Sequence, residues 1–361
     1  MIRFLFAGAL LAALGGCTSL GYYYQAVEGQ MQIWHRSRPI KQVIDDAKTP
    51  PQIRDRLALV LRIREFASVE LALPDNGSYR NYVDLERAFV AWNVFATGEL
   101  SVAPKEWCFP FAGCVGYRGY FSQTDANRFA EDLTRQGLDV FVTGIPAYST
   151  LGWFDDPVLS TILRYPDAEL ARLIFHELAH QVVYVAGDTM FNESFASSVE
   201  LEGVDRWLQH TGDAPQREAF DLREERKTAF VALVMKYRDS LRKLYASAIP
   251  DAEKRQKKTE TFAVMKAEYL TLKASWGGYA GYDRFFAEEL NNAHLVPIAT
   301  YSEMMPGFRR LLAQNDGDFK RFYAAVKELG KLSKAERATR LGASLPGTVQ
   351  SENESLRIAA R

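Results

Sequence analysis

The chain has 361 residues, of which 47% are hydrophobic and 25% are charged. This length and composition suffice for a well-buried core in one large domain or two modest ones, which argues against a disordered chain. The net charge is −1, and the basic residues are spread out and balanced by acids. Since phosphate recognition needs clustered Lys and Arg, we expect no nucleic-acid partner.

Residues 1–17 have the features of a targeting segment and are excluded from fold reasoning. Arg3 supplies a positive charge, residues 4–14 form a short apolar run, and two glycines precede Cys17. The apolar run is too short to span a bilayer as a stable helix. This pattern predicts a signal peptide that ends before Cys17.

Cys17, with the small residues before it, resembles the bacterial lipobox, in which the thiol is acylated and becomes the new N-terminus. The resemblance implies a membrane anchor on Cys17, with an uncleaved anchor or an ordinary signal peptide as the alternatives. Thr18 and Ser19 follow, without the acidic residue that retains lipoproteins at the inner membrane. We therefore expect a periplasmic protein that is lipid-anchored to the outer membrane.

The other cysteines, Cys108 and Cys114, form an even pair in a protein that we expect to be exported. No second cysteine pair or nearby histidine completes a structural zinc set, which favours a disulfide over a metal site. The pair lies in a region of short β-like runs that we expect to form a small antiparallel sheet. The predicted elements of this N-terminal part are helices over 23–35, 40–47, 51–73 and 124–136 and strands over 89–95, 107–109, 115–121 and 138–144.

The central stretch begins at Asp167 and contains neither Pro nor Gly until Gly187. Its apolar residues recur at three- and four-residue spacing, which predicts a helix. His176 and His180 then lie one turn apart on the same face, close enough to share one metal ion. Glu177 lies beside that face, where a carboxylate acts as a general base without binding the ion.

Catalytic zinc usually takes three protein ligands and leaves one position for water, so the two histidines need a third group. Residues 186–190 read as a break, after which a second, antiparallel helix would bring Glu193 back over the histidines. Glu200, two turns further on, is a candidate to hold a ligand imidazole in its tautomer. The alternatives are a chance H-E-x-x-H on an ordinary helix and a helix-start glutamate stabilised by the helix dipole.

At these residues the sequence resembles the gluzincins, whose aminopeptidase branch pairs H-E-x-x-H with an N-E-x-F-A segment, here Asn192–Ala196. The spacer between His180 and Glu193 is shorter than in the best-known gluzincins. The whole chain is similar to a family of bacterial lipoproteins described as predicted aminopeptidases, through segments at Gly21–Ala26, Gly29-Gln30, Ala147–Gly152 and Asn291–Ala293. The resemblance implies zinc and a peptide substrate. A G-x-M-E-N signature for binding a substrate amino terminus is absent, so the choice of aminopeptidase over endopeptidase rests on the resemblance.

The C-terminal part is predicted to be helical, with a long hairpin over 215–248 and 252–276 and further helices over 285–294, 305–315 and 318–329. The glycine-aromatic segment after the hairpin can return a phenol to the site. Tyr279 and Tyr282 are our first candidates for the donor that stabilises the oxyanion, with His294 and Tyr301 as the others. A second prediction is that the strand over 140–144 and the loop over 146–156 hold the peptide by main-chain pairing.

The fold expected from these elements is α+β and predominantly α-helical, with a small antiparallel sheet beside the H-E-x-x-H helix. We divide the chain into a signal peptide (1–17), N-terminal helices with the sheet (18–150), the zinc-binding helical region (151–332) and a polar tail (333–361). The predicted activity is zinc-dependent hydrolysis of peptide bonds. The alternatives are a lipoprotein with a structural metal and a partner-binding hairpin, and an envelope zinc endopeptidase or amidase.

Overall fold

The structure is a computed structural model that describes residues 21–109, 113–302 and 304–342. The predicted signal segment, Cys17 and the tail beyond residue 342 lie outside the described residues. Within this part of the chain, no helix combines the length and the apolar character that crossing a membrane requires.

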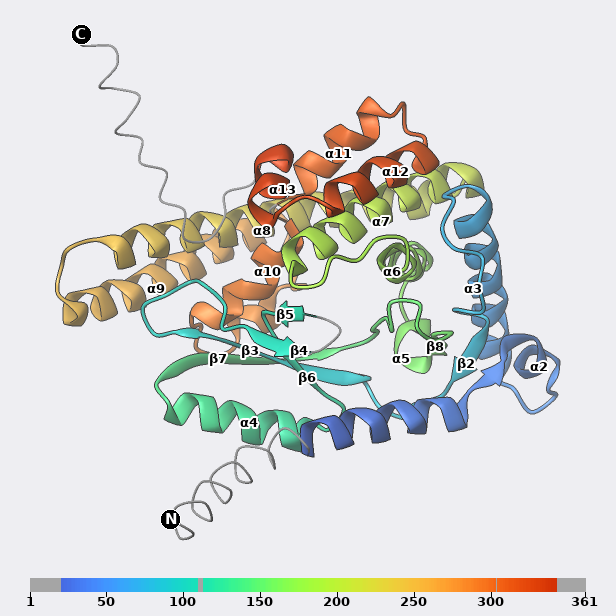
Figure 1. The fold of residues 1–361 in the computed structure, drawn as a ribbon, viewed down its shortest axis with the longest axis horizontal. Coiled ribbons are helices and arrows are strands. Elements are labelled where there is room, and N and C mark those ends of the chain that lie inside the picture. The colour runs from blue at the N-terminus through green and yellow to red at the C-terminus, as the bar shows by residue number, and fades with distance from the viewer. Residues whose placement is uncertain (1–20, 110–112, 303, 343–361) are drawn as a thin grey trace, which may run out of the picture.

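The architecture is α+β and predominantly helical, as predicted (Figure 1). A helix over residues 21–36 comes first. The elements that follow are β1 (Arg38–Pro39), α2 (Ile40–Asp45), α3 (Pro51–Val69), β2 (Asn81–Val83), β3 (Ala91–Gly98), β4 (Trp107–Phe109), β5 (Gly113–Val115), β6 (Arg118–Tyr120), α4 (Gln123–Arg135), β7 (Leu138–Ile145), β8 (Val158–Leu159), α5 (Ser160–Leu163), α6 (Asp167–His180), α7 (Thr189–Thr211), α8 (Ala214–Ala246), α9 (Asp251–Ser275), η1 (Asp283–Phe286), η2 (Asn292–His294), α10 (Leu295–Ser302), α11 (Met305–Gln314), α12 (Phe319–Gly330) and α13 (Lys334–Leu341).

The main sheet is antiparallel, with strand order β6-β3-β7. Side chains of β3 alternate between its faces: Val94 and Ala96 join a cluster with α4, whereas Phe95 packs with Ala293 and Val296. This period of two is what a strand covered on both faces requires. Helix α4 therefore closes one face of the sheet, and the chain around η2 and α10 covers the other (Figure 1).

Two smaller sheets differ from the prediction. The expected strand over 115–121 is split into β5 and β6 by a bend at Gly116-Tyr117, and β4 pairs with β5 in a separate hairpin whose facing residues Cys108 and Cys114 are joined by a disulfide. A third sheet, β1-β2-β8, was not predicted. Its strands have two or three residues and pair across long sequence separations, so they leave little local pattern.

Helices α6 and α7 form the centre of the largest hydrophobic cluster, together with α3 and the C-terminal helices. Figure 1 views α6 nearly along its axis, while α7 runs across the picture above it. The two helices therefore cross, and the prediction of an antiparallel pair was wrong. The reversal between them still returns α7 over α6.

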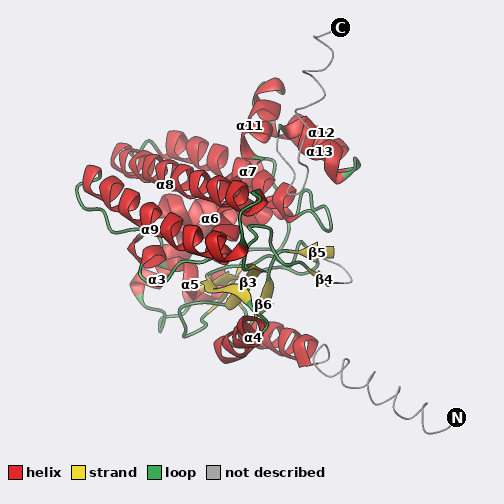
Figure 2. Ribbon diagram, turned by 90° about the vertical axis from the view of Figure 1, so that its left-hand side faces the viewer, coloured by secondary structure: helices red, strands yellow, loops and turns green. Residues whose placement is uncertain are grey.

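The predicted hairpin is present as α8 and α9, which lie side by side in both views (Figures 1 and 2).

The prediction of one helix over 285–294 was wrong, because this stretch holds the short 3-10 turns η1 and η2. Asn291 starts η2, and its side chain accepts a hydrogen bond from the backbone N–H of Ala293. Such a cap begins a new element and therefore prevents one continuous helix.

Candidate metal centre

The centre is built on the last turn and a half of α6. His176, Glu177 and His180 are each less than 9% exposed, although all three are polar. Buried polar groups need hydrogen-bonding or ionic partners, so the side chains on this face of α6 require polar groups from other elements. Those groups come from α7.

The connection between α6 and α7 is held by Asn192. Its side-chain Oδ1 accepts from the N–H of Val185 at 2.8 Å, and its Nδ2 donates to the carbonyl of Val185 at 2.9 Å. Asp188 caps α7 by accepting from the N–H of Phe191. Helix α6 ends at His180, earlier than the break predicted at 186–190, because the chain is bound to α7 here. Glu193, the residue after Asn192, is thereby turned toward the histidines.

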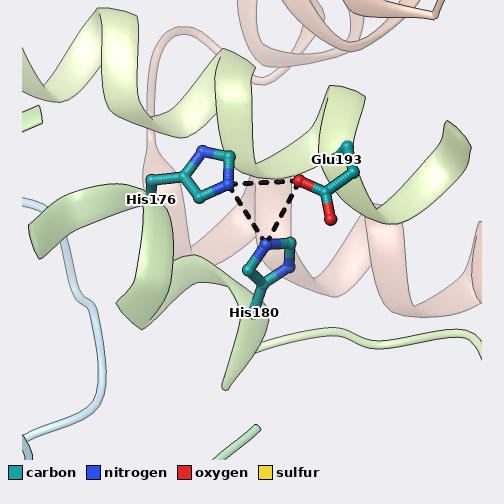
Figure 3. Close-up of side chains that lie close together, drawn as sticks. All are labelled: His176, His180 and Glu193. Atoms are coloured by element: carbon teal, nitrogen blue, oxygen red, sulfur yellow. Dashed lines mark hydrogen bonds and ion pairs between the residues drawn. The ribbon is translucent and has the colours of Figure 1, made fainter. Parts of the chain in front are cut away.

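Three side chains converge on one point (Figure 3). The Nε2 atoms of His176 and His180 are 3.2 Å apart, and Glu193 Oε2 lies 3.2 Å from the first and 3.6 Å from the second. Ligand atoms bound at about 2.1 Å in tetrahedral geometry lie about 3.4 Å from one another. The spacing of the three atoms therefore fits one small cation between them.

The charges around this point favour a cation. Burial acts to raise the pKa of Glu193, but His180 and His176 hold it well below its usual range, so the carboxyl is ionised. For His176, burial lowers the pKa, and the hydrogen bonds to Glu193 and Glu200 more than reverse this, so its pKa lies well above the usual range. A site that attracts a proton so strongly between two imidazoles and a carboxylate also attracts a metal ion that displaces that proton.

His176 is oriented from behind by Glu200. Its Nδ1 lies 2.7 Å from Glu200 Oε2, and Arg172 Nε donates to the other carboxylate oxygen of Glu200 at 2.7 Å. Arg172 also pairs with Glu224 at 2.7 Å. An acceptor on Nδ1 fixes the ring orientation and the tautomer in which Nε2 binds a metal, once the metal displaces the proton. By contrast, none of the described residues hydrogen-bonds to Nδ1 of His180.

Glu177 lies next to the triad without belonging to it. Burial raises the pKa of its carboxyl, and the charges of His176 and His180 oppose this rise. A carboxylate with a raised pKa is a stronger base than one in water. The position and the chemistry of Glu177 both suit proton transfer.

Two cavities meet at His176 and Glu177. The first has a volume of about 460 Å³ and contains the whole triad, with Tyr117, Tyr148 and Tyr184 in its walls. The second, of about 670 Å³, extends between α6, α7, α8 and α10 and is lined mainly by apolar side chains. Ile145 and Ala147 line both cavities.

The predicted substrate strand is β7, which is an edge strand of its sheet. Near Val140 the edge is covered, because the Asn291 side chain donates to the Val140 carbonyl at 2.9 Å. The carbonyl of Pro146 is also engaged, by the Thr161 hydroxyl at 2.6 Å. Of β7 only its last residue, Ile145, borders the cavities. The loop that follows lines both of them, the first with Ala147, Tyr148, Ser149 and Leu151 and the second with Pro146 and Ala147.

The structure does not bring the predicted oxyanion donors to the triad. Tyr282 stacks on Phe230 with ring centroids 4.0 Å apart, and Tyr279 packs against Arg226. His294 lies over Phe141, and burial lowers its pKa to about 4. Neither cavity includes any of these three in its walls. The side chain of Tyr301 lies outside the described part.

The phenols that do line the triad's cavity were missed from the sequence. Burial, and then the charge of Glu193, raises the pKa of both Tyr117 and Tyr184. Tyr184 lies four residues after His180, which was a usable signal. Tyr117 comes from the bend between β5 and β6, and no local pattern connects it with α6.

Comparison with known proteins gave one match. A family model described as "Putative aminopeptidase" matches residues 21–341. No curated protein and no solved structure matched significantly.

Proposed function

The chain belongs to the family described as "Putative aminopeptidase", and we propose that it hydrolyses peptide bonds in a zinc-dependent reaction with Glu177 as general base. The observation that carries the proposal is the convergence of one atom each from His176, His180 and Glu193 to within 3.6 Å of one another. Two imidazoles and one carboxylate are a typical donor set for catalytic zinc, whereas magnesium and calcium prefer oxygen ligands alone.

The ligands proposed for zinc are His176, His180 and Glu193, and Glu200 holds His176 in the tautomer that binding requires. When bound, zinc supplies a Lewis acid that polarises the scissile carbonyl and lowers the pKa of a water molecule. Glu177 accepts the proton of this water while the water oxygen bonds to the carbonyl carbon. The same carboxyl then passes the proton to the amine nitrogen as the C–N bond breaks.

The negative charge that develops on the carbonyl oxygen needs a donor from the chain. We assign this role to Tyr117, with Tyr184 as the second candidate, in place of Tyr279 and Tyr282. Both assigned phenols line the cavity that holds the triad. Since burial raises the pKa of Tyr117 far above neutrality, its hydroxyl stays protonated and can donate.

The family points to an aminopeptidase. A second candidate, an envelope endopeptidase or amidase, is favoured by the two cavities that flank His176 and Glu177, because a chain extending on both sides of the scissile bond has room there. In the second cavity, Glu200 and Glu224 are both ion-paired with Arg172. A substrate amino terminus would therefore compete with an arginine for these carboxylates.

A peptide-library digest with mass-spectrometric mapping of the cut sites tests the proposal. We expect cleavage with zinc, none after chelation, and recovery on adding zinc back. Removal of single N-terminal residues supports an aminopeptidase, and internal cuts support the second candidate. Stoichiometric zinc without hydrolysis of any peptide would contradict the proposal and indicate a structural metal.

We also propose that Cys17 is acylated and anchors the protein to the outer membrane on its periplasmic side. The support is the sequence of residues 1–19. Metabolic labelling with palmitate should mark the full chain and not the Cys17→Ala variant, and membrane fractionation should locate the label. A wild-type chain that takes up no label would contradict the anchor.

A further inference from the structure

The helix over residues 21–36 presents large apolar side chains to solvent. Five of them form what we call the apolar stripe: Tyr23, Tyr24, Val27, Met31 and Trp34, which are 43%, 70%, 59%, 46% and 39% exposed. At 3.6 residues per turn, these positions fall within about 100° around the helix axis. They therefore make one continuous face and are not scattered exposed residues.

A different face of the same helix is packed against the protein. Ile33 is 1% exposed, and Gly29 lies so close to Phe121 that a Cβ would stand 2.2 Å from its ring. The Gln25 side chain accepts from the N–H of Phe121 at 3.0 Å. These contacts fix the helix in place. It therefore cannot rotate about its axis to bury the apolar stripe against the protein.

The stripe continues onto a loop from another part of the chain. The ring of Phe154 meets Trp34 at 4.5 Å between centroids, and Phe154 and its neighbour Trp153 are 49% and 69% exposed. Contiguous apolar surface of this kind marks an interaction site. Tyr and Trp are enriched where proteins meet the interfacial region of a bilayer.

We propose that the apolar stripe, with Trp153 and Phe154, lies in the surface of a phospholipid bilayer. The proposal goes beyond peptide hydrolysis and rests on the proposed acylation of Cys17. Only four residue steps separate Cys17 from Gly21, and they span at most about 14 Å. The lipid anchor therefore holds the start of the stripe at the membrane. This closeness favours the bilayer as the occupant over a soluble partner or a second copy of the chain.

Apolar burial, and not charge, drives this docking. The two arginines that follow the stripe in the sequence are already paired, Arg36 with Glu86 at 3.5 Å and Arg38 with Asp46 at 3.1 Å. Binding should therefore occur on uncharged lipid and should depend little on salt.

The docked helix also forms a wall of the triad's cavity. Tyr22, Ala26 and Gln30 of this helix line that cavity, and the Tyr148 hydroxyl donates to Gln30. In Figure 1 the helix runs along the lower edge of the molecule. Docking places one wall of the cavity about one helix diameter, or about 10–12 Å, from the bilayer surface.

The test uses the mature chain without its acyl group, residues 18–361, and phosphatidylcholine vesicles in a sedimentation assay. We expect the chain to sediment with the vesicles, and Tyr24→Ser/Val27→Ser/Met31→Ser to weaken binding by about tenfold or more. The matched control replaces exposed apolar residues of α3 and α9, as Val69→Ser/Val264→Ser/Leu270→Ser, and should bind like the wild type. Circular dichroism checks that both variants fold.

Brominated lipid gives a second readout, which is measured on the wild-type chain and needs no polar substitution in the stripe. It should quench tryptophan fluorescence in the wild type, and Trp34→Phe/Trp153→Phe should remove most of the quenching. Wild-type chain that stays in the supernatant, or a stripe variant that still sediments, overturns the proposal. The proposal is also overturned if the wild-type chain is a dimer that does not bind vesicles and the stripe variant is a monomer. Hydrolysis of a soluble peptide should be unchanged by the stripe substitutions, which separates this test from that of the peptidase.

Discussion

The α6–α7 pair and the α8–α9 hairpin are both built from two long helices rich in charged residues, but they use charge in opposite ways. In α6 and α7, Arg172, His176, Glu193 and Glu200 are buried and bonded to one another. In the hairpin, pairs such as Lys236–Glu268 and Lys257–Glu253 lie at the surface. Buried charges are costly unless they are paired, whereas exposed pairs contribute little.

The comparison teaches where chemistry is to be sought in this molecule. The hairpin holds its helices together through an apolar seam of Phe230, Val234, Leu241 and Met265, and pairs such as Lys236–Glu268 lie outside this seam. The α6–α7 pair retains a charged network inside the largest hydrophobic cluster, which stability alone does not require. Perturbed titratable groups in such a place are typical of functional sites.

The largest expected effect is that of Glu177→Gln. It removes the proposed base and keeps the shape of the side chain, so turnover should fall by about 10²- to 10⁴-fold while zinc content stays the same. Glu268→Gln in the hairpin is the matched control and should keep full turnover. Steady-state kinetics with metal analysis provides the measurement, and a Glu177→Gln enzyme with normal turnover would disprove the general base.

Arg172→Met tests the buried network directly. Glu200 and Glu224 would lose their shared cation, and breaking one partner of a buried pair costs about 3–5 kcal/mol. The free energy of unfolding should be measured by urea titration in the presence of chelator, so that zinc binding does not contribute. If the free energy of unfolding fell by less than about 1 kcal/mol, the buried network would contribute no more to stability than the exposed ion pairs of the hairpin.

Tyr117→Phe removes one hydroxyl from the cavity wall. If that hydroxyl stabilises the oxyanion, kcat should fall by about 10²-fold or more with little change in KM. Tyr282→Phe is the control, because Tyr282 stacks on Phe230 away from both cavities. Should Tyr184→Phe lower kcat instead, the role belongs to Tyr184.

Glu200→Gln weakens the support of His176. The amide can no longer hold the imidazole tautomer as a carboxylate does, so zinc affinity should fall by about 10- to 100-fold. Competition with a chromophoric chelator measures this change. An unchanged dissociation constant would show that Glu200 serves only to neutralise Arg172.

The smallest effect is expected in the hairpin. Lys236→Met breaks the exposed pair with Glu268, and the free energy of unfolding should change by less than about 1 kcal/mol. The same urea titration as for Arg172→Met gives the direct comparison. A loss as large as that of Arg172→Met would erase the distinction between the two regions.

Several features of the fold were predictable because their cause is local. The helical periodicity around His176 and His180, the strand Leu138–Ile145 and the hairpin around Pro250 each lie within one continuous stretch of chain. Errors occurred where a distant partner decides the outcome. Examples are β6, which pairs with β3 while β5 pairs with β4, and Asn291, whose side chain donates to the Val140 carbonyl.

The sequence alone determined which residues share a helical face: the four-residue spacing of His176 and His180 places both imidazoles together wherever the helix lies. It also supplied the apolar pattern that buries α6. Only the tertiary structure decided that α7 crosses α6 with Glu193 facing inward, that Arg172 joins Glu200 behind His176, and that Tyr117, not Tyr279 or Tyr282, borders the triad. The physical reason is range, because backbone geometry acts over a few residues, whereas convergence of a site depends on how whole elements pack.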